Sequence, residues 1–195
     1  MPTFTFKIEL MDTQPLVVRT FSVASESYMY LLHHFIQEVM GWKNYHLYQF
    51  TFDNITIADK RLVSDELGPV SDAKTIMVED ICTKKGAILN YEYDFGDGWE
   101  HQIELIEISN QPVNALIPII ISGQNACPPE DCGGVGGYEE LKKVLLDPGN
   151  EENKDMWEWV GYKFNPQEFN KKSAEKELLK LNTKLTLYEK GFNQD

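Results

Sequence analysis

The stretch YEYDFGDGWEH, from Tyr91 to His101, places aromatic side chains, acids, glycines and a histidine close together. Asp94, Asp97 and His101 are the residues in it that could do chemistry. Carboxylates and imidazoles bind divalent cations, and both act as general acids or bases. The same pattern also predicts a β-hairpin, since apolar residues alternate on both sides of a glycine-containing turn. Two interpretations therefore stay open: a metal or catalytic site, and a hairpin built for the fold.

The apolar alternation predicts the register of this hairpin. A three-residue loop at 96–98 pairs Phe95 with Trp99 and Tyr93 with His101, which puts the apolar residues on one face. The last glycine of the loop is then expected at positive φ. In this register His101 lies on the aromatic face, where a hydrogen-bonded core histidine is the simpler interpretation and a ligand role is the alternative. Trp99 lies beside it and is a candidate binding residue.

The acids of the hairpin have structural explanations as well. Asp97 is expected to bond to its own backbone in the turn. Asp94 is expected to face Glu100, with Glu92 and Glu104 further along the same side. Because opposed like charges are unfavourable, this face is predicted to be either solvated or occupied by cations.

A second segment with chemical potential is ACPPEDCGGVGGYEEL, which contains Cys127, Glu130, Asp131 and Cys132. Four residues separate the two cysteines, a spacing within the range of zinc ligands. A structural zinc site needs two more ligands, and the residues available are His33, His34, His46, His101 and Cys82. The candidate metal set is His101, Cys127 and Cys132. The alternative is a pair of free thiols packed in a turn.

The glycines at 133–134 and 136–137 precede a helix expected to begin near Tyr138. Glycine-rich loops at helix starts can hold phosphate through backbone N–H groups. Here no lysine follows as in a P-loop, and acids flank the loop, so nucleotide binding is disfavoured. A hinge that lets the loop pack is the preferred interpretation.

The elements that must position these residues form an α+β pattern, with strands in the first half of the chain and helices in the second. We predict a single compact domain over 1–170 with a mixed, mainly antiparallel, roll-like sheet. An early helix follows a β-hairpin, and a C-terminal helix within 171–195 packs on the same domain. Expected strands are 3–10, 16–23, 46–52, one near Ile55, 75–81 and the hairpin; expected helices are 25–41, 138–146, 154–160 and 173–190. A long irregular segment, 111–137, lies between the two halves.

Composition limits the function classes. The 195 residues carry a formal net charge of −13, without a clustered basic face, which disfavours nucleic-acid binding. The longest apolar run, 115–121, is interrupted by Pro118 and is far shorter than the roughly 20 residues of a membrane span. The first residues alternate like a strand and do not resemble a signal peptide. Three cysteines argue against a disulfide framework. We expect a cytoplasmic protein.

Five blocks occur in an order that resembles a known family: VVRTFSV, MGWKNYHLYQF, YEYDFGDGWEHQIEL, CPPEDCGGVGGYEEL and WVGYKFNPQEFN. The family is the plasmid pRiA4b ORF-3-like family, some of whose members are encoded beside plasmid or transposon genes. The resemblance runs from about Thr3 to Asn170, and Asn170 stands where the family often has aspartate. It implies a compact α+β fold with a mixed sheet and helices packed on it, and it implies no activity. It also marks the hairpin and the loop as signatures whose residues we follow below: His46, Asp94, Asp97, His101, Cys127, Glu130, Asp131 and Cys132.

Two functions follow from these observations. The first is a binding or interaction module, in which the aromatic hairpin and the 111–137 loop recognise a protein or a small molecule; an acidic surface favours basic partners. The alternative is a metal-dependent hydrolase, acting for example on phosphodiesters, with a divalent cation held by Asp94, Asp97, His101 or Asp131. Whether the protein is an enzyme stays open. A further hypothesis is that these two family signatures, the hairpin and the loop, lie side by side, so that His46, His101 and the acids or thiols of the loop converge on one pocket.

Overall fold

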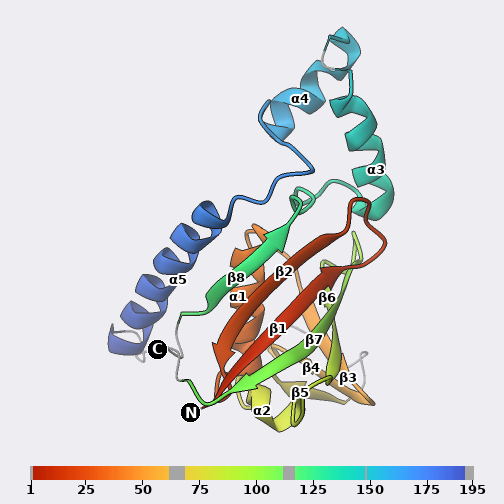
Figure 1. The fold of residues 1–195 in the computed structure, drawn as a ribbon. Helices are drawn as coiled ribbons and strands as arrows, with labels where there is room; N and C mark the ends of the chain where they lie inside the picture. The colour runs from red at the N-terminus through yellow and green to blue at the C-terminus, as the bar shows by residue number, and fades with distance from the viewer. Residues whose placement is uncertain (1, 62–68, 112–116, 148, 192–195) are drawn as a thin grey trace.

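The computed structural model describes residues 2–61, 69–111, 117–147 and 149–191. It confirms the α+β class: one open sheet of eight strands carries the helices (Figure 1). The strand order is β5-β4-β3-β6-β7-β1-β2-β8, and every neighbouring pair is antiparallel except β4 and β5. The strands are β1 (Thr3–Leu10), β2 (Val17–Ala24), β3 (Tyr48–Phe52), β4 (Ile55–Ala58), β5 (Val70–Asp72), β6 (Ile88–Tyr93), β7 (Trp99–Ser109) and β8 (Ile119–Gln124).

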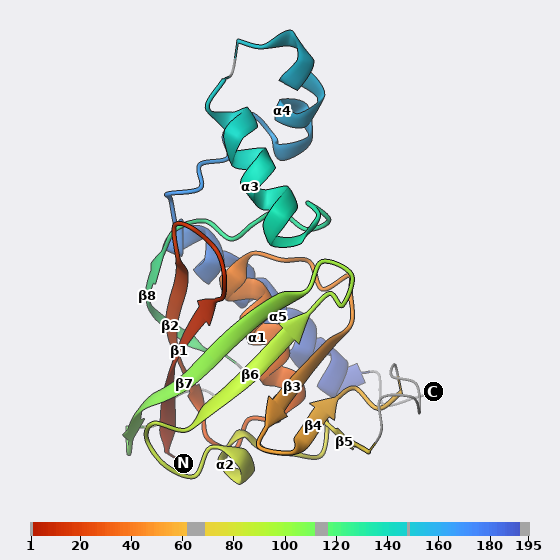
Figure 2. The same ribbon diagram turned by 90° about the vertical axis from the view of Figure 1, so that its right-hand side faces the viewer.

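The helices are α1 (Met29–Met40), α2 (Val78–Ile81), α3 (Gly134–Leu145), α4 (Lys154–Val160) and α5 (Lys171–Gly191), with a short 3₁₀ turn at Glu151–Asn153. Seen from the side, α1 and α5 lie behind the sheet, while α3 and α4 project beyond one end of it (Figure 2). Among the described residues, none of these helices is long and apolar enough to cross a bilayer. We call the projecting part, α3 to α4, the arm.

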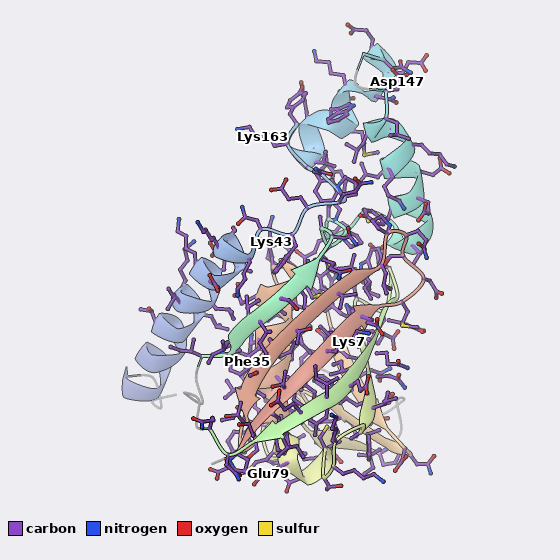
Figure 3. The ribbon with its side chains drawn as sticks, in the orientation of Figure 1. Lys7, Phe35, Lys43, Glu79, Asp147 and Lys163 are labelled. Atoms are coloured by element: carbon purple, nitrogen blue, oxygen red, sulfur yellow. The ribbon has the colours of Figure 1, made fainter. Side chains whose placement is uncertain are left out.

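The core lies between α1 and the sheet. As the apolar period predicts, Leu32, Phe35, Ile36 and Val39 of α1 are buried. The helix ends at Gly41, which has φ 98° and donates its backbone N–H to Gln37 O. Figure 3 contrasts Phe35 in this core with Lys7 on the outer face of the sheet. Helix α5 extends the core, because its Leu178 and Leu181 are buried.

Two expected elements differ in the structure. The strand predicted at 75–81 is wrong: Met77 forms only an isolated bridge with Tyr28, and Val78–Ile81 is a helix. Asp80 explains the difference, since its Oδ2 accepts the backbone N–H of Met77 at 2.8 Å and caps the helix start. The irregular segment 111–137 contains strand β8, and helix α3 begins at Gly134 instead of near Tyr138. Part of that segment, 112–116, lies outside the described residues, as do residues 192–195 of the predicted C-terminal segment.

The hairpin of β6 and β7 keeps the predicted faces but not the predicted register. Tyr93 pairs with Trp99 and Tyr91 with His101, so the loop is 94–98, two residues longer than expected. A shift by two leaves the residues that stay paired on their predicted faces, whereas Asp94 and Phe95, predicted in the ladder, lie in the loop. The extra residues arise because Asp94 adopts φ 57° and leaves the ladder, while Phe95 is partly exposed. The glycine at 98 has the expected positive φ, 67°.

Candidate metal site

Three potential metal ligands from three distant segments meet at the tip of this hairpin. They are His46, in the segment before β3, Asp94, at the start of the hairpin loop, and Asp131, in the loop before α3. Their ligand atoms all lie within 4.8 Å of one another. Nε2 of His46 lies 3.0 Å from Oδ1 of Asp131 and 3.6 Å from Oδ2 of Asp94. One imidazole and two carboxylates therefore point to a common centre.

The imidazole nitrogen at this centre has no hydrogen bond. Although Nε2 of His46 lies at ion-pair distance from both carboxylates, it is buried and forms no hydrogen bond with the described residues. A buried polar atom without a partner is costly unless something else satisfies it. A cation between the nitrogen and the carboxylate oxygens would do so.

Asp94 is fixed by its own turn. Its Oδ1 accepts the backbone N–H of Gly96 at 3.0 Å, and its backbone N–H donates to Leu47 O at 2.9 Å. Asp94 and not Asp97 thus makes the turn bond, which corrects the sequence expectation. The structure also pairs Glu92, not Asp94, with Glu100. With Oδ1 engaged and only 8% of the residue exposed, the carboxylate of Asp94 presents Oδ2 to His46.

Tyr93 fixes the segment that carries His46. The Tyr93 hydroxyl oxygen accepts the backbone N–H of Tyr45 at 3.0 Å and that of His46 at 3.4 Å. The same hydroxyl donates to Oε1 of Glu130 in the loop before α3. Burial and the adjacent Glu130 raise the pKa of Tyr93, so the phenol stays protonated and can act as this donor. One side chain therefore ties the His46 segment to the loop.

A buried polar network also holds the segment that carries His46. Nδ1 of His33 lies 2.9 Å from the Tyr91 hydroxyl, and its Nε2 lies 2.7 Å from Oδ1 of Asn44. Gln37 donates to the Tyr91 hydroxyl and accepts the backbone N–H of Asn44. These partners require Nε2 of His33 to carry the proton, since the Asn44 oxygen can only accept. Burial holds the pKa of His33 well below its usual value, which keeps the ring neutral.

The loop that carries Asp131 docks on the hairpin through its backbone. The N–H of Gly133 donates to Oδ2 of Asp97 at 3.2 Å, and the indole of Trp42 donates to Pro128 O at 3.0 Å. Gly134 packs so closely that a Cβ there would lie 2.5 Å from Asp97 O. The predicted neighbourhood of hairpin and loop is thus present, and Asp97 holds the loop instead of its own turn.

The remaining candidates lie away from this centre. His101 and Trp99 are each 1% exposed, in the core beneath the hairpin. Nδ1 of His101 lies 3.2 Å from Tyr91 O and 3.1 Å from Trp99 O, so it carries the proton and donates to backbone. Burial lowers the pKa of His101 to about 4. These contacts match the core-histidine interpretation.

The cysteines do not join the metal group. Among the described residues, the group of potential ligands contains His46, Asp94 and Asp131, and the predicted set of His101, Cys127 and Cys132 is not formed. Burial raises the pKa of Cys127, and burial with nearby Asp97 raises that of Cys132 to about 12. In the metal-free protein both are therefore thiols at neutral pH, as the free-thiol interpretation expects.

A cavity of about 670 Å³ adjoins the centre, between α1, the His46 segment and the hairpin tip. His46, Asp94, Asp59 and Arg61 are among its lining residues. Two further lining atoms are buried without a hydrogen-bond partner among the described residues: the Tyr48 hydroxyl and Nε2 of His34. No pattern in the sequence indicated a role for the Tyr48 or Tyr93 hydroxyl, because each residue looks like an ordinary core residue.

Comparisons with known proteins place this geometry in context. A family model described as "Plasmid pRiA4b ORF-3-like protein" matches residues 2–173. A curated relative, "Uncharacterized protein y4hQ" of Sinorhizobium fredii (strain NBRC 101917 / NGR234), is 34% identical over 157 residues, which are 80% of this chain and 79% of that protein. The crystal structure of the protein of unknown function MM3350 from Methanosarcina mazei Go1 is similar, with a TM-score of 0.77 and 32% identity, covering 88% of this chain and 96% of that one.

Proposed function

This chain belongs to the plasmid pRiA4b ORF-3-like family, and we propose that it is a metal-dependent hydrolase whose divalent cation binds to His46, Asp94 and Asp131. The observation that carries the proposal is the convergence of these three ligand atoms within 4.8 Å. Three protein ligands are typical of catalytic metal sites, which keep a coordination position open for water or substrate. A bound cation would supply a nucleophilic water at neutral pH.

The ligand types support a choice of metal. Carboxylates suit magnesium and manganese, whereas imidazole suits zinc and other transition metals. A set of one imidazole and two carboxylates favours manganese or zinc. The thiols, which would have favoured zinc alone, are outside the set.

The surroundings support a small substrate. The adjoining cavity, about 670 Å³, is in the range of small-molecule sites. The net charge of −13 disfavours a nucleic-acid polymer. A small phosphodiester fits both conditions, with its reacting group at the cation and its remaining polar groups near the Tyr48 hydroxyl and Nε2 of His34.

Glu130 is the candidate proton acceptor. Its Oε1 accepts from Tyr93, while its Oε2 is buried and has no hydrogen-bond partner among the described residues. It directly precedes Asp131 and contacts the same tyrosine that holds the His46 backbone. We propose that this unpartnered carboxylate oxygen accepts the proton of the attacking water.

The test begins with metal content. Protein purified without chelators and dialysed against manganese or zinc should bind about one equivalent by elemental analysis. The His46→Ala and Asp94→Asn variants should lose it. Asp53→Asn is the matched control, because Asp53 has the same left-handed backbone, with φ 51°, but lies outside the ligand group.

The second test separates hydrolysis from binding. The metal-loaded protein should cleave bis(p-nitrophenyl) phosphate, and Glu130→Gln should lower the rate by about 100-fold while it retains the metal. Metal binding without cleavage of this diester or of p-nitrophenyl esters would reject the hydrolase and leave a metal-binding protein. Absence of metal in the wild-type protein would reject both.

The interaction-module interpretation retains support from the arm. Met156 and Trp159 are exposed there, as is Tyr162 just after α4, and a cavity of about 290 Å³ lined by Leu141, Met156 and Trp159 borders Asp131. Exposed aromatic and methionine side chains are typical of recognition surfaces. On an array of lysine-rich peptides, Trp159→Ala should reduce binding, while the Mn²⁺ affinity stays unchanged. Equal peptide binding by the wild-type protein and the Trp159→Ala variant would contradict the interaction-module interpretation.

A further inference from the structure

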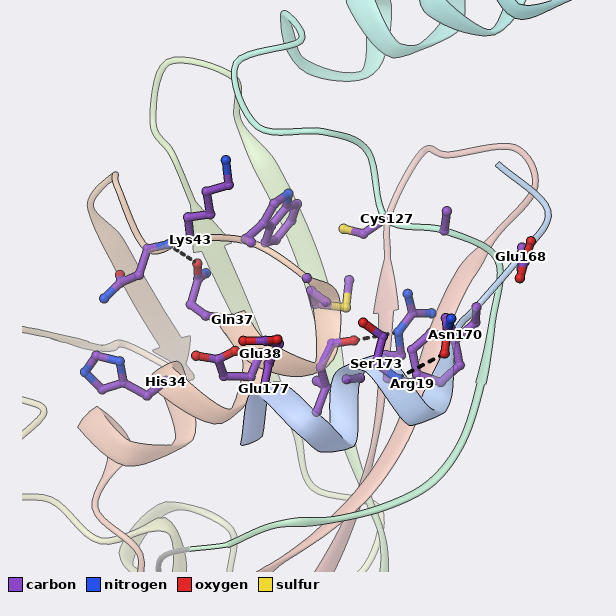
Figure 4. Close-up of a pocket in the computed structure, with 18 residues that line it drawn as sticks. Arg19, His34, Gln37, Glu38, Lys43, Cys127, Glu168, Asn170, Ser173 and Glu177 are labelled. Carbon is purple, nitrogen blue, oxygen red and sulfur yellow. Dashed lines mark hydrogen bonds between the residues drawn. The ribbon is translucent and has the colours of Figure 1, made fainter. Parts of the chain in front are cut away.

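A second cavity, of about 570 Å³, lies between α1 and the start of α5 (Figure 4). Its walls include Arg19 of β2 and Phe169, which lies just before α5. It shares only His34 and Asn44 with the cavity beside the metal site, and none of the three metal ligands lines it. It is therefore a separate site to explain.

Arg19 is a buried cation in the wall of this cavity. It is 1% exposed, and its hydrogen bonds go to backbone carbonyls: Nε to Val39 O, and Nη1 to Val18 O and Gln124 O, each at 2.8 Å. Its Nη2 forms no hydrogen bond with the described residues, and none of their carboxylates forms an ion pair with it. A buried positive charge with free donors is unfavourable unless an anion joins it, which makes Arg19 a candidate anion-binding residue.

The contacts of this guanidinium fix it in place and limit how it can bind. The Phe169 ring lies over it, with 3.9 Å from the guanidinium carbon to the ring centroid. Gly123 permits this packing, because a Cβ there would overlap the Phe169 ring and approach Cδ of Arg19 to 2.9 Å. Burial lowers the pKa of Arg19 to about 10, so the group stays charged at neutral pH. Because Nε and Nη1 are engaged, Arg19 offers one donor nitrogen instead of the paired donors that match a planar carboxylate.

The start of α5 brings a second set of donors to the same part of the cavity. Asn170 directly follows Phe169, and its Oδ1 accepts the backbone N–H of Ser173 at 3.0 Å, which caps the helix. Asn170, Ser173 and Ala174 line the cavity, and Figure 4 shows the first two on the side of Arg19. The start of a helix carries partial positive charge and N–H groups without intrahelical partners. In the sequence, the first turn of α5 contains no acid that would offset this charge.

The acids in the cavity wall do not compensate Arg19. Both carboxylate oxygens of Glu177 accept the ammonium group of Lys180, at 2.6 and 2.8 Å, and Glu38 has an interaction partner of its own. Figure 4 shows Glu38 and Glu177 on the side away from Arg19. The third acid of the lining, Glu168, is exposed. The positive charge of Arg19 and of the start of α5 is therefore available to a ligand.

We propose that this cavity binds a phosphate group between Arg19 and the first turn of α5, carried by inorganic phosphate or by a small phosphomonoester. Nη2 of Arg19 donates to one phosphate oxygen. The Ser173 hydroxyl, which forms no hydrogen bond with the described residues, and the first N–H groups of α5 donate to others. A tetrahedral anion has oxygens in several directions, which suits donors from two separate elements. The cavity of about 570 Å³ has room for phosphate and for a group esterified to it.

Isothermal titration calorimetry tests the ligand. The protein is first freed of metal with a chelator, so that no cation at His46 can bind phosphate. Inorganic phosphate should bind, and acetate should bind about tenfold more weakly or worse. Glycerol 3-phosphate distinguishes the two sources: tighter binding than phosphate indicates an ester, and weaker binding indicates the free ion. Acetate binding as tightly as phosphate, or absence of binding by both phosphates up to about 10 mM, would overturn the proposal.

Variants locate the site. Ser173→Asp places a carboxylate in the first turn of α5, where it suits the helix but repels phosphate, so binding should weaken about tenfold or more. The matched control is Thr183→Asp, exposed on the same helix about 15 Å further along and outside the cavity, which should stay within about twofold. Equal losses in the two variants would indicate an effect of net charge alone and overturn the assignment.

Two further variants complete the test. Arg19→Lys removes Nη2 and should weaken phosphate binding about tenfold or more; if it does not fold, the Ser173 and Thr183 pair decides. Asp94→Asn should bind phosphate normally, because Asp94 does not line this cavity. Loss of binding in Asp94→Asn would place the phosphate in the metal site and overturn the assignment.

Discussion

The two halves of the candidate metal site are built in different ways. The sheet half, His46 and Asp94, rests on the core: Asp94 is 8% exposed and occupied by its own turn, and the His46 segment is held by Tyr93. The loop half, Asp131, has a side chain that is 64% exposed. Its loop is held by three hydrogen bonds: Gly133 donates to Asp97, Trp42 to Pro128 O, and Tyr93 to Glu130.

The difference indicates a division of roles. A ligand pair fixed by a packed core is preorganised, so it determines whether a cation binds at all. A ligand on a docked loop contributes less to the affinity for the cation, because ordering the loop costs free energy that offsets part of the gain from binding. A cation, once bound, should in turn hold the loop on the hairpin.

The largest expected effect concerns the core beneath the sheet half. Burial lowers the pKa of His101 from its usual value of 6.5 to about 4, so the unfolded state binds the proton more tightly. Its contribution is therefore fully present above pH 6.5 and is lost as pH falls toward 4. This lowering of the pKa corresponds to about 3 kcal/mol of unfolding free energy. Urea denaturation across this pH range measures it.

The variant for this prediction is His101→Asn, whose side-chain amide can donate to Tyr91 O as Nδ1 of His101 does. It should flatten the pH dependence by about 1.4 kcal/mol per pH unit between 4 and 6.5. An unchanged slope would mean that other groups, such as the buried His33, carry the acid sensitivity of the core.

The next effect compares the two carboxylates directly. Asp94→Asn should weaken Mn²⁺ binding by about 100-fold, and Asp131→Asn by about tenfold, as measured by calorimetry. Asp53→Asn should bind normally, since Asp53 lies outside the ligand group. Equal losses in Asp94→Asn and Asp131→Asn would contradict the asymmetry of the two halves.

The sequence predicted the features that local patterns encode. The period of α1 predicted its buried face and its end at Gly41, and the alternation of the hairpin predicted which residues share a face. The register was predicted wrongly, because a shift of the pairing by two residues leaves the alternation of apolar and polar side chains unchanged. The actual loop depends on the left-handed backbone of Asp94, whose side chain makes the turn bond expected of Asp97.

The site was only partly visible in the sequence for a related reason. His46, Asp94 and Asp131 were each candidates, but their proximity depends on the pairing of β3 with β6 and on the docking of the loop. No local pattern encodes such long-range contacts. Tyr93 was assigned to the apolar face, as observed. Its hydroxyl nevertheless links the two halves of the site, because it bonds to the His46 segment and to Glu130 of the loop.

A moderate effect is expected where the loop touches the hairpin. Gly134 has φ 66°, and a Cβ there would lie 2.5 Å from Asp97 O, so Gly134→Ala should displace the loop and weaken Mn²⁺ binding about tenfold. Gly136→Ala is the matched control: a Cβ there has nothing within 4 Å, and its binding should be unchanged. A similar loss in both variants would indicate a general effect on α3 instead of loop docking.

The smallest effect isolates one hydrogen bond of the loop half. Asp97 accepts the Gly133 N–H through Oδ2, and an asparagine can accept it through its amide oxygen. Asp97→Asn should therefore change Mn²⁺ affinity by less than about threefold, while Asp97→Ala, which removes the acceptor, should weaken it by about three- to tenfold. If Asp97→Asn lost as much Mn²⁺ affinity as Asp97→Ala, then the charge of Asp97, and not its hydrogen bond, would determine the affinity for the cation. Asp97 would then belong with the ligands, and the loop half would no longer be the weaker one.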